Sequence, residues 1–142
     1  MKKTLSIILS LVMLFSTMPL TAITASATSV TRSSAVSWAN SKVGKSIDWD
    51  GCYGAQCVDL IAAYYNYLGT TTSGGNGCDY ATNKLPSGWS RVKNASGVVP
   101  EAGDIAVWTK GYNGGKWGHV AIVVGADSSN MTVVEQYGST DH

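Results

Sequence analysis

The segment Gln56-Cys57-Val58-Asp59-Leu60-Ile61-Ala62-Ala63-Tyr64-Tyr65 predicts the element around which the chain folds. Its apolar residues recur three and four positions apart, which is the spacing of one broad face of an α-helix. Gly69 ends this pattern, as glycine commonly does after the last turn of a helix. We therefore expect a central helix from about Gln56 to Leu68, with Cys57 in its first turn.

The flanking segments predict an α+β fold in which N-terminal helices pack on an antiparallel β-meander. An earlier helix is expected over Ser33–Val43, with Ser33 or Ser34 as its N-cap and Gly44 as its end. A short helical turn is expected over Tyr80–Leu85. Three strands follow the turn at 100–103, and Asn113-Gly114-Gly115 marks a hairpin between the first two. Their expected ranges are Asp104–Thr109, Trp117–Val124 and Met131–Tyr137.

Residues 1–27 have the features of a secretory signal peptide. Two lysines precede the apolar run Leu5–Leu14, and Ala25-Ser26-Ala27 is a small-residue cleavage site. The run is shorter than a membrane-spanning helix. We therefore expect a secreted chain with no membrane association, cut after Ala27. The alternative is an uncleaved N-terminal anchor.

Residues 28–142 have the length of a single domain. Without the leader, eight basic residues stand against nine acidic ones, and no basic run occurs. Nucleic acid is therefore not an expected partner, and we expect a monomer. Five tryptophans and seven tyrosines suit a groove for a polar polymer, although such residues also serve as core and rim.

Three cysteines in an exported chain predict one disulfide and one free thiol. The expected pair is Cys52–Cys78, which leaves Cys57 free. The pairs Cys52–Cys57 and Cys57–Cys78, and three reduced thiols, remain open because sequence does not supply the geometry of a bridge.

Cys57, His119 and Glu135 form a candidate catalytic set. A turn centred near residues 127 and 128 places His119 opposite Glu135 or Tyr137, on one face of the sheet. Glu135 would then orient the imidazole and favour its charged form. A register slip of one residue would put Gln136 in that place.

The start of the central helix favours a thiolate at Cys57. Unpaired amide groups, the helix dipole and a nearby imidazolium all lower the pKa of a thiol there. The same amides, with Gln56 beside them, could hold the oxyanion of an acyl-transfer intermediate. The alternative is that Cys57 is a small buried apolar residue.

Asp48, Asp50 and Asp59 form a second constellation. Alternating aspartates before Gly51, with another carboxylate close by, supply the hard oxygen ligands that calcium prefers. The alternative is an Asx-turn followed by a carboxylate that favours the first helical turn. A calcium ion here would be structural, because a thiol does not need it for activation.

Four motifs in this order resemble the CHAP family of cysteine, histidine-dependent amidohydrolases/peptidases, within the papain-like NlpC-type group. The resemblance covers about Ser33 to Tyr137. The motifs are Tyr53-Gly54-Ala55-Gln56-Cys57-Val58-Asp59-Leu60, Gly103-Asp104-Ile105-Ala106-Val107-Trp108, Gly118-His119-Val120-Ala121-Ile122-Val123 and Val134-Glu135-Gln136.

The resemblance implies that Cys57 is the nucleophile, His119 the general base and then acid, and Glu135 the group that orients His119. It implies bacterial peptidoglycan as substrate, cut at the N-acetylmuramoyl-L-alanine amide or within the stem or cross-bridge, with no cofactor for catalysis. Some CHAP domains of phage lysins resemble the Asp48 segment and bind calcium there. By position, carbonyls of Cys52 and Gly54 would complete that site.

The chain departs from the family pattern in two places. Family members often have Asn two residues after the Glu, where this chain has Tyr137 as the supporting residue. They also usually continue for another strand or two beyond position 142, so the final strands are either absent or the fold closes early. Two other functions remain open: a cysteine hydrolase of another amide, or a catalytically silent wall-binding module that lacks the final strands. Trp108, Tyr112 and Trp117 would line a substrate groove or shield the sheet edge.

Overall fold

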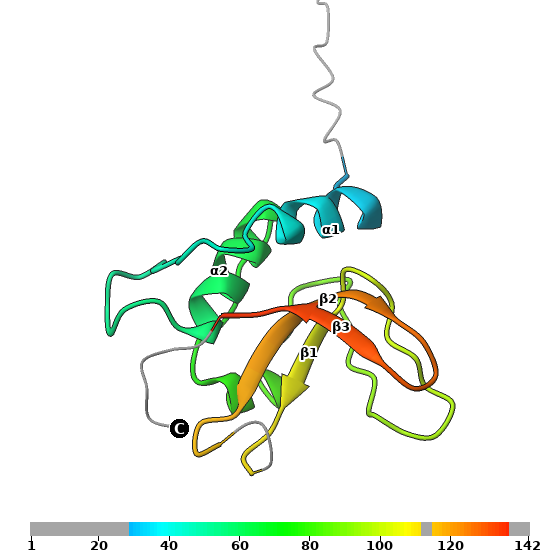
Figure 1. Cartoon of the computed structure of the whole chain (residues 1–142). Helices are drawn as coiled ribbons and strands as arrows, with labels where there is room; N and C mark the ends of the chain where they lie inside the picture. The colour runs from blue at the N-terminus through cyan, green and yellow to red at the C-terminus, as the bar shows by residue number, and fades with distance from the viewer. Residues whose placement is uncertain (1–28, 112–114, 137–142) are drawn as a thin grey trace, which may run out of the picture.

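The computed structural model describes residues 29–111 and 115–136. The predicted signal peptide, the hairpin tip at 112–114 and Tyr137 lie outside the described residues. Two α-helices and a 3₁₀ helix precede three strands (Figure 1). Their bounds are α1 Arg32–Asn40, α2 Cys57–Tyr67, η1 Gly77–Ala81, β1 Ile105–Trp108, β2 His119–Ala126 and β3 Met131–Val134.

The strands form one antiparallel sheet in the order β1-β2-β3. The predicted α+β layout, helices first and then a meander, is therefore confirmed. Within the described part of the chain, no helix is long and apolar enough to cross a membrane.

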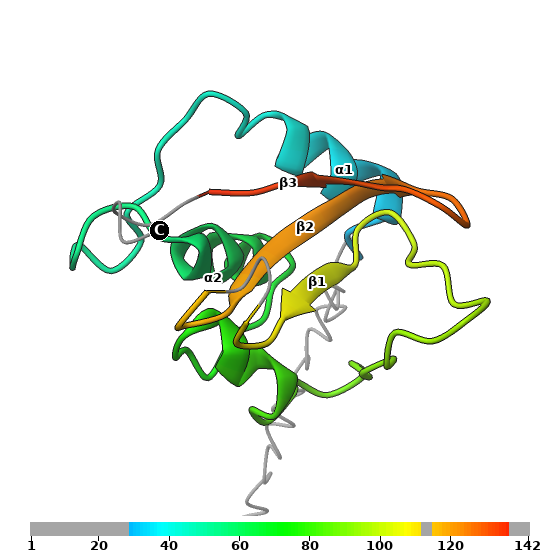
Figure 2. The ribbon, with the colours of Figure 1, turned by 60° about the horizontal axis from the view of Figure 1, so that its bottom comes forward.

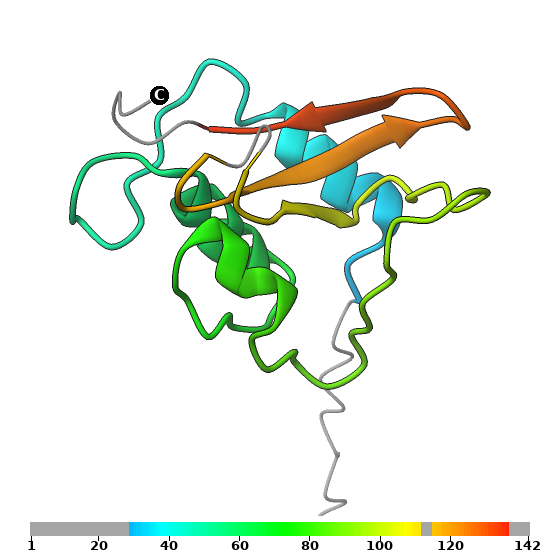
Figure 3. The ribbon, with the colours of Figure 1, turned by 90° about the horizontal axis from the view of Figure 1, so that it is seen from below.

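Helix α2 is the central element, and its observed bounds lie within one residue of the predicted ones. Leu60, Ile61 and Tyr64 are fully buried and pack with Val120 and Ile122 of β2. Burial of each large apolar side chain contributes about 1.5–3 kcal/mol. Val120 and Ile122 are two positions apart in β2, so their side chains point to the same face of the sheet. Helix α2 therefore packs on that face. Figures 2 and 3 show α1 beside the same sheet.

Helix α1 begins and ends earlier than predicted. Thr31 is its N-cap, and the Thr31 Oγ1 accepts the Ser34 amide at 3.1 Å. Ser34 therefore lies inside the first turn and is not the cap. The helix ends at Asn40, and single turns continue the chain to Gly44.

Strand β2 starts at His119, two residues later than predicted, because Gly118 turns the chain. Gly118 has φ +73°, and a Cβ there would lie 2.4 Å from the Cys78 amide nitrogen and 2.6 Å from the Trp108 carbonyl oxygen. The Cys78 amide donates to the Trp117 carbonyl at 2.9 Å. This bond packs the 3₁₀ helix η1 against the start of β2. Helix η1 begins three residues before the helical turn that the sequence predicts.

Gly118→Ala should destabilise the protein by about 2–4 kcal/mol, because a Cβ disfavours φ +73° and η1 must move to make room for it. Gly125→Ala, within β2, is the control, since a Cβ at Gly125 meets nothing within 4 Å. Urea unfolding of both variants measures the difference. Equal stability of the two variants would contradict this account of the β2 start.

Candidate active site

His119 and Glu135 are in direct contact. The His119 Nε2 lies 2.8 Å from the Glu135 Oε2. His119 is the first residue of β2 and is buried at 8% exposure, while Glu135 directly follows β3. The pair Ile122↔Val134 fixes the register. Its continuation aligns Glu135 with the residue two beyond His119, so the two side chains are diagonal neighbours on one face.

This contact uses Nε2 and leaves Nδ1 on the other side of the imidazole ring. Trp108, the partner of His119 in β1, lies beside the ring, with centroids 5.6 Å apart at 40°. The carboxylate and the indole therefore hold the imidazole in one orientation.

Cys57 is the first residue of α2 and is half-buried. The backbone amides of Val120, Val58 and Cys57 itself lie close enough to the sulfur to favour its thiolate form. The sulfur therefore lies at the backbone of Val120, the residue that follows His119 in β2. The start of α2 and the start of β2 thus meet near this thiol, and the predicted catalytic role of Cys57 stays a prediction.

The pKa of Cys57 moves in the opposite direction from the prediction. Burial raises the pKa of this thiol, and the three nearby backbone amides, which favour the thiolate, offset only part of that effect. The negative charge of Asp59 raises the pKa further. Burial at this position therefore favours the neutral thiol over the thiolate.

Asp59 fixes the first turn of α2. Its Oδ2 accepts the Gln56 amide at 2.7 Å and its Oδ1 accepts the Trp49 amide at 3.1 Å. The carboxylate is 3% exposed. Gln56 contributes to the site through its backbone, and its predicted role in holding an oxyanion stays a prediction.

Gln136 is a functional residue that the sequence analysis considered only as a substitute for Glu135. Its Oε1 accepts the Ile47 amide at 2.8 Å, and its Nε2 donates to the carbonyls of Ile47 at 2.6 Å and Gln56 at 2.7 Å. One side-chain amide thus ties the end of β3 to the N-cap of α2. Strand alternation could have indicated this role from the sequence, because it places the Gln136 side chain on the opposite face from Glu135.

The predicted calcium ligands converge. One oxygen from each of Asp48, Asp50 and Asp59 lies within 4.8 Å of the others. Oxygen ligands 2.3–2.6 Å from a shared calcium ion are at most about 5 Å apart, so the three carboxylates fit one ion. The Asp50 Oδ1 also accepts the Cys52 amide at 2.8 Å, which is an Asx-turn. Both sequence interpretations of this segment are thus compatible with the structure.

The predicted Cys52–Cys78 disulfide is not present, because all three cysteines are free thiols. Cys52 is exposed on the segment before α2. Cys78 is held in η1 against the start of β2, and its thiol points to the Asp79 Oδ1 at 3.6 Å.

The aromatic residues of the predicted groove lie at the histidine end of the sheet. Trp108 contacts His119, and Trp117 is 52% exposed with the Lys116 ammonium 4.5 Å from its ring centroid. Tyr112 falls outside the described residues.

Residues 46–137 match the CHAP domain family model, and the chain belongs to this family. The chain is 37% identical over 108 residues to endolysin PlyTW of Staphylococcus phage Twort, covering 72% of this chain and 23% of that protein. It is 39% identical over 94 residues to endolysin LysK of Staphylococcus phage K, covering 63% of this chain and 19% of that protein. The chain thus spans about a fifth of these relatives.

A crystal structure of the wild-type endolysin LysIME-EF1 has a similar fold. The TM-score is 0.59 at 32% sequence identity, with 67% of this chain and 44% of that chain covered. This neighbour agrees with the α+β architecture described above.

Gln136→Glu should lower stability by about 2–3 kcal/mol, because the Nε2 that donates to the carbonyls of Ile47 and Gln56 is replaced by a carboxylate oxygen that repels them. Gln56→Glu is the matched control, since it makes the same chemical change on the neighbouring segment without touching these three bonds. Thermal unfolding at neutral pH compares the two. A Gln136→Glu variant as stable as wild type would exclude the tie between β3 and α2.

Proposed function

We propose that this chain is a secreted peptidoglycan hydrolase that cleaves an amide bond of the bacterial cell wall by thiol catalysis. The observation that carries the proposal is the 2.8 Å contact between His119 and Glu135 beside the helix start that bears Cys57. Membership of the CHAP family and similarity to proteins named endolysins support it. The predicted signal peptide would export the enzyme to its polymeric substrate.

In the proposed mechanism His119 takes the proton of Cys57, and the thiolate attacks the amide carbonyl. Glu135 stabilises the imidazolium that forms, as a carboxylate in contact with the ring does. The tetrahedral oxyanion would be held by the amides at the start of α2; one such donor typically contributes 10²–10³-fold to the rate. The imidazolium then protonates the leaving amine, and water hydrolyses the thioester.

The raised pKa of Cys57 suits this sequence of steps. A thiol kept protonated by burial is protected until a base acts on it. The proton therefore leaves when His119 is in place to accept it. The bond cut is either the N-acetylmuramoyl-L-alanine amide or a peptide bond of the stem or cross-bridge.

Cys57→Ala should abolish the clearing of purified cell walls and the release of new amines, because the nucleophile is lost. Glu135→Gln should lower the turnover rate by about 10²-fold or more, since Gln can orient the imidazole but does not stabilise its charge. Turbidity and amine assays on the same walls measure both effects, and mass spectrometry of the fragments identifies the bond.

Equal clearing by wild type and Cys57→Ala would reject thiol catalysis. Binding to walls without new amines from the wild type would identify a silent wall-binding module. Amines released from another peptide but not from walls would identify a hydrolase of a different amide.

We also propose that Asp48, Asp50 and Asp59 hold one calcium ion, with backbone carbonyls of Cys52 and Gly54 as further ligands. The ion would neutralise three carboxylates that otherwise repel one another. Its role would be structural, because Asp59 caps the helix that carries Cys57.

Calcium should raise the melting temperature, and Asp48→Asn should weaken calcium binding by at least about tenfold, because a charged ligand is lost. Asp48 is exposed and is not the carboxylate that caps α2, so the variant should fold. Calorimetry and thermal unfolding with calcium or EDTA provide the measurement. A melting temperature unchanged by EDTA would exclude the site.

A further inference from the structure

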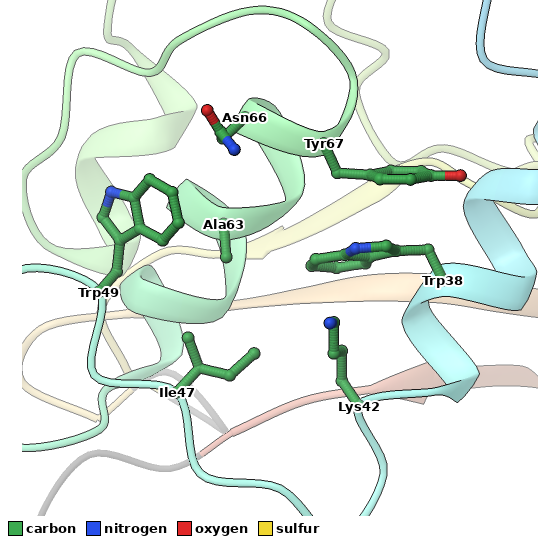
Figure 4. Close-up of a pocket in the computed structure, with 7 residues that line it drawn as sticks. All are labelled: Trp38, Lys42, Ile47, Trp49, Ala63, Asn66 and Tyr67. Carbon is green, nitrogen blue, oxygen red and sulfur yellow. The ribbon is translucent and has the colours of Figure 1, made fainter.

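A hollow of about 350 Å³ lies between α1, α2 and the segment that precedes α2 (Figure 4). Trp38 and Tyr67 border it on one side and Trp49 on the other, with Ala63 at its floor. The volume is within the range of small-molecule sites, and the mixture of aromatic faces and few polar groups is typical of them. None of these side chains takes part in the proposed thiol chemistry.

The two aromatic sides of the hollow differ in how much ring surface a ligand can contact. Tyr67 stacks on Trp38 with centroids 5.2 Å apart at 21°, and the Lys42 ammonium lies 4.5 Å from the centroid of the same Trp38 ring. Trp38 and Tyr67 therefore form a fixed wall. Trp49 is 50% exposed and lies across the hollow from them in Figure 4. It is the side chain with an aromatic face available to a ligand.

Small and polar residues complete the hollow. Ala63 presents only a methyl group, so the space above α2 stays open (Figure 4). The Asn66 amide and the Lys42 ammonium stand at the rim and provide hydrogen-bond donors. An occupant should therefore have an apolar flat face and acceptor groups around its edge.

We propose that this hollow binds a sugar ring of the peptidoglycan glycan strand, an inference that rests on the proposed function. A pyranose ring has flat C–H faces that stack on an indole, and its hydroxyl and acetamido oxygens accept hydrogen bonds at its edge. A peptide that binds as an added strand fits less well, because that mode needs an open backbone edge. The floor here is helix α2, whose backbone groups are bonded within the helix.

The hollow and the proposed catalytic elements are held by the same two residues. The segment that supplies Trp49 is held by Gln136 at Ile47 and by Asp59 at the Trp49 amide. These two residues also fix the start of α2 and thus Cys57. A sugar bound against Trp49 would therefore lie on the chain segment that leads to the nucleophile.

Calorimetry tests this proposal by measuring how tightly the full chain binds a β-1,4-linked N-acetylglucosamine tetramer. Trp49→Ala should weaken binding by about tenfold, because the stacking face is lost, and Trp49→Phe should restore most of it. Ala63→Leu should also weaken binding, since it fills the hollow from the floor. Val43→Ala is the control: Val43 is 67% exposed, follows Lys42 and does not line the hollow.

A second measurement separates the sugar site from the active site. On intact walls, Trp49→Ala should raise KM with kcat unchanged, and on a sugar-free stem peptide it should behave as wild type. The proposal is overturned by no tetramer binding, by equal binding of all variants, or by a sugar-free stem peptide whose binding requires Trp49. If the proposed hydrolase activity is wrong, walls treated with the wild-type protein release no amines. The tetramer binding measurement does not depend on that activity and still tests the sugar site.

Discussion

The antiparallel pairing of β2 with β3 is the constraint on which the site depends. The register Ile122↔Val134 brings Glu135 to His119 on one face and turns Gln136 toward the start of α2 on the other. A slip of one residue would exchange these two side chains and destroy both contacts at once. The irregularity between Val123 and Gly125 lies beyond this region, toward the turn, and leaves the pairing at the catalytic end regular.

Apolar packing and polar ties have separate roles in this small fold. Tyr64 and its buried neighbours attach α2 to the sheet, which determines that the helix lies there. Hydrogen bonds from Asp59 and Gln136 then fix the position of its first turn. The same two residues hold the segment that bears Trp49 and the acidic cluster. The proposed nucleophile, metal site and sugar site therefore share one set of supports.

The sequence was sufficient where a pattern acts locally. Helical periodicity placed α2 within one residue, and the turn near residue 127 put His119 and Glu135 on one face. The sequence was not sufficient where the outcome depends on tertiary contacts. The late start of β2 follows from the close approach of Gly118 to η1. The predicted Cys52–Cys78 pair is not formed, because cysteine count and spacing do not supply the geometry that a bridge requires. The raised pKa of the thiol likewise depends on burial, which a helix-start argument omits.

The rate of alkylation of Cys57 by iodoacetamide as a function of pH, read by peptide mass spectrometry, tests the central claim most directly. Cys52 and Cys78 report general thiol reactivity in the same sample. If the imidazole of His119, held by Glu135, stabilises the thiolate, His119→Ala and Glu135→Gln should both move the rise in Cys57 alkylation to higher pH while the other two cysteines stay unchanged. Superimposable Cys57 profiles in wild type and both variants would contradict the account.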